Sequence, residues 1–231
     1  MLRRGEAMLL HCEREAAADD PTRACAWLRP GTLDSLVELN ESCLALLAAQ
    51  AEVRGGPASA LLEPLAARWR ALDASARHRA ARCPYLLLDA GFGDPVRWRT
   101  ACTAPHVADA GRDRYGGWFS VPSAAGVARL VFIFAWHLAR SQPAAARLLL
   151  GMAVPSATLI SRCTLRQVQE LAEIHTAWLR PRWPTRVQVW RELLTAASAG
   201  DSAALERARL RGVTLLAAEA RVRSGVRTGS P

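Results

Sequence analysis

Apolar residues recur every three or four positions through most of the chain, which is the spacing of amphipathic helices. The first predicted helix runs over 32–54, with Leu36, Cys43 and Leu47 on one face. Two more are predicted over 58–72 and 73–83, because Pro64 would kink the first and Asp73 would cap the second. The pattern then weakens, and we expect an irregular central connector near residues 85–123.

The second half of the chain carries a stronger helical pattern. Residues 124–141 are almost wholly apolar, so we expect them to form the central helix. Proline, glycine and capping residues then predict further helices over 143–150, 155–162, 164–178, 184–197 and 201–222. The predicted fold is an all-α, multi-helix orthogonal bundle. We divide it into an N-terminal helical region, 1–118, and a C-terminal basic helical domain, 119–231.

Composition supports the helical prediction and adds an uneven charge. The chain of 231 residues is 51% hydrophobic, contains no lysine, and is rich in the helix formers alanine, leucine and arginine. Its thirty arginines exceed its acidic residues by nine, and residues 129–231 alone hold fifteen arginines against six acids. Such an asymmetry is typical of a surface for nucleic acid or an acidic partner, although an arginine-rich solvated surface has the same composition.

The sequence favours a cytoplasmic protein that does not enter the membrane. Its N-terminus lacks the long apolar stretch of a secretory signal, and its longest apolar run, Leu130–Ala139, would cross only half a bilayer. Six cysteines are scattered without a Cys-x-x-Cys pair, which favours reduced thiols over a metal or redox centre. We therefore expect no metal and no cofactor.

No catalytic arrangement is recognisable. The five histidines are isolated from any nucleophile with a fitting motif. We interpret His137 and His175 as core or interface residues, and residues 89–94 as a turn. The chain is therefore predicted not to be an enzyme, and no catalytic residue is assigned.

Tryptophan and arginine residues are interleaved between residues 178 and 191. Residues of these types can stack on bases or anchor a protein interface, but they also fill the corners between packed helices. Just before them, helices 155–162 and 164–178 meet at a tight turn that is compatible with a helix-turn-helix. Glu170 and Glu173 count against a direct reading of DNA by the second helix, since phosphate would repel them.

Several short elements of the stretch 130–182 follow one another without gaps. They are Ala135-x-x-Leu138, Ala144-x-Ala146, Leu150-Gly151, Ala157-Thr158, Thr164-Leu165-x-Gln167, Leu171-Ala172-Glu173 and Arg182-Trp183. In this order they resemble the core of the FlhD-like family of flagellar transcriptional activators. The resemblance covers 53 of the 231 residues. It implies an all-α, dimerising, DNA-associated regulator that works with a second regulatory protein.

These observations predict a non-enzymatic transcriptional regulator that acts through DNA, a partner subunit, or both. The alternative is a helical adaptor or assembly protein of a motility or secretion system. The expected partners are double-stranded DNA, a partner regulator subunit and a second copy of the chain. The residues expected to contact DNA or a partner are Arg162, Arg166, Arg180, Arg182, Arg186, Trp183 and Trp190.

Overall fold

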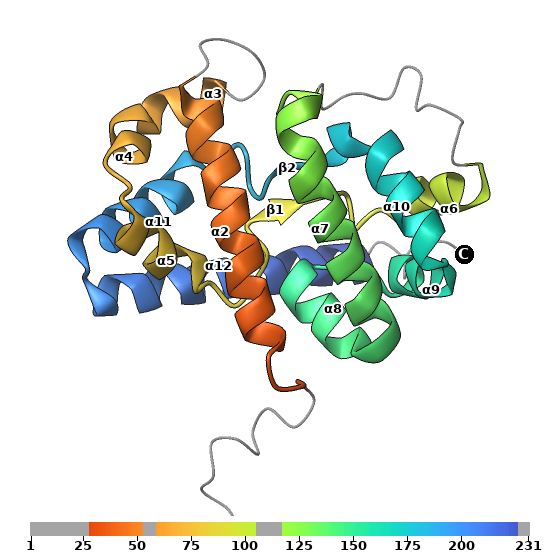
Figure 1. Ribbon diagram of the computed structural model, residues 1–231. Helices are drawn as coiled ribbons and strands as arrows, with labels where there is room; N and C mark the ends of the chain where they lie inside the picture. Colours follow the sequence, from red (N-terminus) through yellow and green to blue (C-terminus); the bar gives the residue numbers. More distant parts are fainter. Residues whose placement is uncertain (1–27, 53–58, 105–116, 226–231) are drawn as a thin grey trace, which may run out of the picture.

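The computed structural model describes residues 28–52, 59–104 and 117–225, and most of these residues are helical (Figure 1). This confirms the prediction of an all-α, multi-helix fold. The first part contains α2 (Thr32–Ala51), α3 (Ser59–Leu62), η2 (Glu63–Leu65), α4 (Ala66–Arg70), α5 (Ala74–Ala81), β1 (Leu88–Asp89) and α6 (Pro95–Thr103). The second contains α7 (Val121–Ser141), α8 (Pro143–Leu150), α9 (Val154–Arg162), α10 (Leu165–Ile174), η3 (Thr176–Trp178), β2 (Arg180–Pro181), α11 (Val187–Ala199) and α12 (Ser202–Gly225).

Local signals explain where many of these helices begin and end. The Asp73 side chain accepts the Ala76 N–H at 2.7 Å and starts α5. Thr164 and Gln167 form a reciprocal capping box at the start of α10. Gly151 ends α8 in the left-handed region, at φ 65°, where a glycine has no steric penalty.

The connector expected near residues 85–123 is shorter and more ordered than its sequence indicated. Residues 95–103 form α6, because the Asp94 carboxylate accepts the Val96 and Arg97 N–H groups and Pro95 suits the first turn. Helix α7 already begins at Val121. Residues 105–116 lie outside the described part of the chain.

One hydrophobic core joins helices from both sides of residue 118. Helix α7 packs against α2, α8, α9 and α10, and α11 packs against α4, α5 and α12. Figure 1 shows α2 and α7 side by side, with α12 running behind them across their direction. Strands β1 and β2 pair antiparallel between these groups, with Leu88 opposite Pro181 and Asp89 opposite Arg180.

Buried Asn40 ties α2 to the segment that leads into β1. Its side-chain amide donates to the carbonyl oxygens of Ala81 and Tyr85, each at 3.0 Å, and its carbonyl oxygen accepts the Leu87 N–H at 2.9 Å. These bonds satisfy backbone groups that no regular sheet pairs in this segment. Asn40 thereby helps to set the position of β1, against which β2 and its arginines are placed.

Candidate functional site

A polar pocket of about 350 Å³ lies where the β1–β2 pair meets the start of α6 and the last turns of α12. We call it the arginine pocket, because five of its lining side chains are guanidinium groups and three are carboxylates. The arginines are Arg97, Arg180, Arg182, Arg186 and Arg223, and the acids are Asp89, Asp94 and Glu219. The fold therefore gathers here three of the arginines that the sequence singled out, together with two that it did not.

The β1–β2 register places Arg180 directly opposite Asp89. Arg180 Nη2 donates to Asp89 Oδ2 at 2.8 Å, and Nε donates to the same oxygen at 3.2 Å. Burial alone would raise the pKa of Asp89, but the charges of Arg182 and Arg180 outweigh it and hold the pKa below its usual value. This ion pair is therefore charged on both sides near neutral pH.

Arg182 is almost fully buried, with 5% of its surface exposed. Its Nε donates to the Leu86 carbonyl oxygen at 2.7 Å, and its Nη2 donates to the carbonyl oxygens of Leu88 and Leu150 at 3.2 and 3.0 Å. Burial lowers the pKa of this guanidinium from its usual value, while nearby acids oppose that effect. Arg182 thus connects β1 to the end of α8 from inside the protein.

Trp183 and Trp190 are also buried, and both indole N–H groups are used within the fold. Trp183 donates to Glu219 Oε1 at 2.7 Å and meets the Tyr85 ring edge-on. Trp190 donates to the Arg182 carbonyl oxygen at 2.8 Å and is only 2% exposed. To contact DNA or a partner, Arg182 and both tryptophans would have to leave the core.

The other predicted contact residues are more accessible. Arg186 is exposed at the rim of the arginine pocket. Arg162 is the exposed last residue of α9, and Arg166 lies in the first turn of α10, where its Nε donates to Glu170 Oε1 at 2.9 Å. Arg162 and Arg166 do not line the arginine pocket, so the fold separates the predicted contact residues into two groups.

Sequence reasoning missed Arg97 and Arg223. The Arg97 guanidinium lies over the Trp178 ring, 4.1 Å from its centre. Arg223 Nη2 donates to the Gly151 carbonyl oxygen at 3.2 Å. Both lie far along the chain from Arg180–Arg186, so no spacing could relate them to the pocket.

The guanidinium groups of Arg223 and Arg182 lie close against Gly93 and Gly151, which have no side chain. A Cβ atom at Gly93 would lie 2.7 Å from Arg223 Nη1, and one at Gly151 would lie 3.1 Å from Arg182 Nη1. Larger residues at these positions would displace a guanidinium group. The pocket therefore depends on small residues as well as on charged ones.

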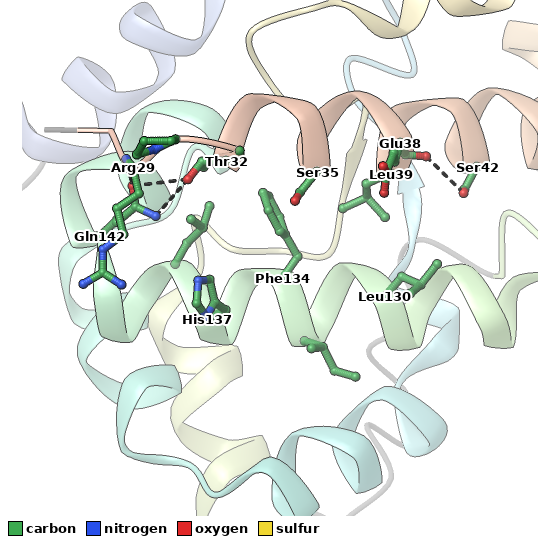
Figure 2. Close-up of a pocket in the computed structure, with 14 residues that line it drawn as sticks. Arg29, Thr32, Ser35, Glu38, Leu39, Ser42, Leu130, Phe134, His137 and Gln142 are labelled. Carbon is green, nitrogen blue, oxygen red and sulfur yellow. Dashed lines mark hydrogen bonds between the residues drawn. The ribbon is translucent and has the colours of Figure 1, made fainter. Parts of the chain in front are cut away.

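A second hollow, of about 550 Å³, lies between α2 and α7 (Figure 2). We call it the α2–α7 groove. Its apolar lining comes from Leu39, Leu130, Ile133, Phe134 and Leu138, and its polar lining includes Arg29, Thr32, Ser35, Glu38, Ser42, His137 and Gln142. At one end the Gln142 side-chain oxygen accepts the backbone N–H of Arg29 at 2.6 Å, and the Gln142 side-chain NH2 group donates to Thr32 Oγ1 at 3.0 Å.

The histidines and cysteines do not form a recognisable reactive centre in the described part of the chain. His137 lines the α2–α7 groove, while buried His175 stacks on Trp178 with ring centres 4.0 Å apart. Cys102 and Cys163 bring their Sγ atoms to 3.6 Å. Residues 28–52, 59–104 and 117–225 contain no group of three His, Cys, Asp or Glu side chains that could hold a metal ion.

No protein-family model, curated protein or solved structure matches this chain. The resemblance of residues 130–182 to the flagellar activators stays a prediction. Among the described helices, one segment, Pro122–Ser141, is long and apolar enough to cross a membrane by length and composition. It forms most of α7, which packs against α2, α8, α9, α10 and η3.

Proposed function

We propose that this chain is a non-enzymatic adaptor that binds an amphipathic helix of a partner protein in the α2–α7 groove. The observation that carries the proposal is an accessible apolar strip on α7, with polar groups at both ends. Leu130 is 52% exposed, and Ile133 and Phe134 are only partly buried beside it. A groove of this kind suits the apolar face of a helix, which would anchor through residues spaced i, i+3, i+4 and i+7.

The dimensions and charges of the groove define the partner further. Its α2 side extends from Thr32 to Ser42, which is about 15 Å along a helix axis, or nearly three turns. Arg29 and His137 lie at one end, and Glu38 lies nearer the other (Figure 2). The complementary ligand is a helix of about three turns whose acidic end faces Arg29 and whose basic end faces Glu38.

A designed peptide provides the test. It carries leucines at i, i+3, i+4 and i+7, glutamates at one end and arginines at the other, and a fluorophore for anisotropy. A scrambled peptide of the same composition serves as its control. We expect the wild-type chain to bind the patterned peptide and not the scrambled one.

Two leucine variants locate that binding. Leu130→Glu places a charge in the groove and should abolish binding, since burying the carboxylate has no compensating partner. Leu148→Glu is the matched control, because Leu148 on α8 is 58% exposed and lies outside the groove lining. Equal binding by both variants, or no preference for the patterned peptide, would overturn the proposal.

Contact with duplex DNA is a second candidate function, supported by the turn between α9 and α10. Exposed Arg162 and Arg166 flank this turn, where they could reach phosphates. Two acids lie on α10, and they form ion pairs with Arg166 and Arg129. DNA affinity measured at rising salt tests this function: affinity no greater than that of a neutral control protein, or insensitive to salt, would exclude it.

A further inference from the structure

We infer that the arginine pocket binds a phosphate dianion, either free or as the monoester group of a small metabolite. This site is separate from the α2–α7 groove and does not depend on the proposed adaptor function. Its lining holds five arginines and three carboxylates. Arg182, Arg186 and Arg223 are the cations that we expect to contact the anion.

The way the cations are held keeps their charge available to a ligand. Arg182 donates its Nε and Nη2 bonds to three backbone carbonyl oxygens, which carry no formal charge. The charge of Asp89 acts on Arg182, but this carboxylate also forms an ion pair with Arg180, so it does not serve Arg182 alone.

Arg223 and Arg186, which also line the pocket, are weakly paired with carboxylates or not paired with one. Arg223 Nη1 is 3.9 Å from Glu219 Oε2, a long ion pair, and Glu219 also accepts the Trp183 indole N–H through its other oxygen. Arg186 lies exposed at the rim, and no carboxylate of the described residues forms an ion pair with it. Asp94 caps α6 and is occupied by two backbone N–H groups.

Guanidinium groups suit phosphate because their planar N–H forks can bind two oxygens at once. The volume of about 350 Å³ lies near the lower end of the roughly 300–1,000 Å³ that is usual for small-molecule sites. The pocket therefore has room for a phosphate with a small attached group. Trp183, in the pocket lining, has a backbone φ of 52°, and strained residues of this kind cluster at binding sites.

Isothermal titration of the full chain in a phosphate-free buffer tests the inference. The probes are inorganic phosphate, glucose 6-phosphate and, as the uncharged control, glucose. We expect both phosphates to bind at millimolar or lower concentration and glucose not to bind. Tighter binding of glucose 6-phosphate identifies a monoester site, whereas equal affinities identify a site for the phosphate group alone.

A rim variant locates the bound phosphate. Arg186→Gln should weaken binding about tenfold or more through loss of a charge-assisted hydrogen bond, without affecting the core. Arg162→Gln is the matched control, because it removes an exposed arginine outside the pocket. Thermal unfolding of both variants verifies that each is folded.

The charge of the probe supplies a third readout. A phosphate monoester loses its second proton near pH 6, so affinity should fall as the pH drops below about 6. No heat of binding from either phosphate, or equal affinity in the Arg186 and Arg162 variants, would overturn the inference. So would affinity that does not change across pH 6.

Discussion

Replacing Arg182 by methionine separates a structural role of this residue from a contact role. Methionine has a similar length and no donor, so the carbonyl oxygens of Leu86, Leu88 and Leu150 would lose their bonds to the guanidinium group. Arg186→Met is the matched control, since it makes the same replacement four residues later at an exposed position. We expect only the first change to destabilise the fold.

The magnitude follows from the three bonds. Leaving a buried hydrogen-bonding group without its partner costs about 1–3 kcal/mol, and three carbonyl oxygens would each lose a bond. Because methionine keeps the apolar packing and Asp89 keeps its bond to Arg180, we expect a loss at the lower end of the summed range, about 3–4 kcal/mol for Arg182→Met. An exposed substitution such as Arg186→Met should change stability by less than about 0.5 kcal/mol.

Urea unfolding followed by tryptophan fluorescence measures the difference. With a slope of about 2–3 kcal/mol per molar urea, the midpoint should fall by roughly 1–2 M for Arg182→Met and hardly move for Arg186→Met. Equal midpoints would refute the reasoning that Arg182 stabilises the interior. Arg182 would then return to the set of candidate contact residues.

Four further expectations can be measured with the same preparations. Because the pKa of Asp89 is lowered in the folded state, this residue contributes stability that is present above about pH 4 and lost as the pH falls further. Acid unfolding of Asp89→Asn should therefore depend less on pH than that of the wild type. Parallel curves of stability against pH would contradict this. Asn40→Ala should lower the unfolding free energy by about 2–4 kcal/mol in urea, since the Leu87 N–H and nearby carbonyls lose their partner; an unchanged midpoint would show that water replaces it. Thr164→Ala should cost about 1 kcal/mol in the same assay through loss of the α10 capping box, and no loss would mean that the cap adds nothing. Burial raises the pKa of the Cys83 thiol to about 11, so mass spectrometry should find it unalkylated by iodoacetamide in the folded protein at pH 8 and alkylated in urea; labelling of the folded protein would contradict its burial.

The helices were largely predictable because their signals are local. A capping side chain at Asp73 or Thr164 acts on backbone groups within three residues, and the turn glycine at Gly151 needs only its own backbone freedom. The one clear difference, α6, also had a local signal in Asp94-Pro95. That signal was outweighed by the surrounding glycines and prolines, which indicated an irregular connector.

The burial of the arginine–tryptophan segment could not be predicted in this way. Arg182 is placed inside the protein by carbonyl groups more than thirty residues away, at Leu86, Leu88 and Leu150. A charged residue beside a tryptophan has the same local pattern on a surface or in a corner between helices. The acceptors that decide between these environments are backbone atoms, which carry no sequence signal.

The uneven charge along the chain acquires a spatial meaning in the fold. Arginines of the basic second half reach acceptors in the neutral first half, as Arg180 does with Asp89 and Arg209 with the Arg79 carbonyl oxygen at 3.0 Å. The charge of Arg180 is thus balanced by a carboxylate of the first half, whereas Arg209 keeps its charge because a carbonyl oxygen carries none. Arg186 and Arg223 line a hollow in which arginines outnumber acids, and Arg186 is exposed there. A compact anion can balance charge there more completely than an extended surface of DNA, since several guanidinium groups converge on one volume of about 350 Å³.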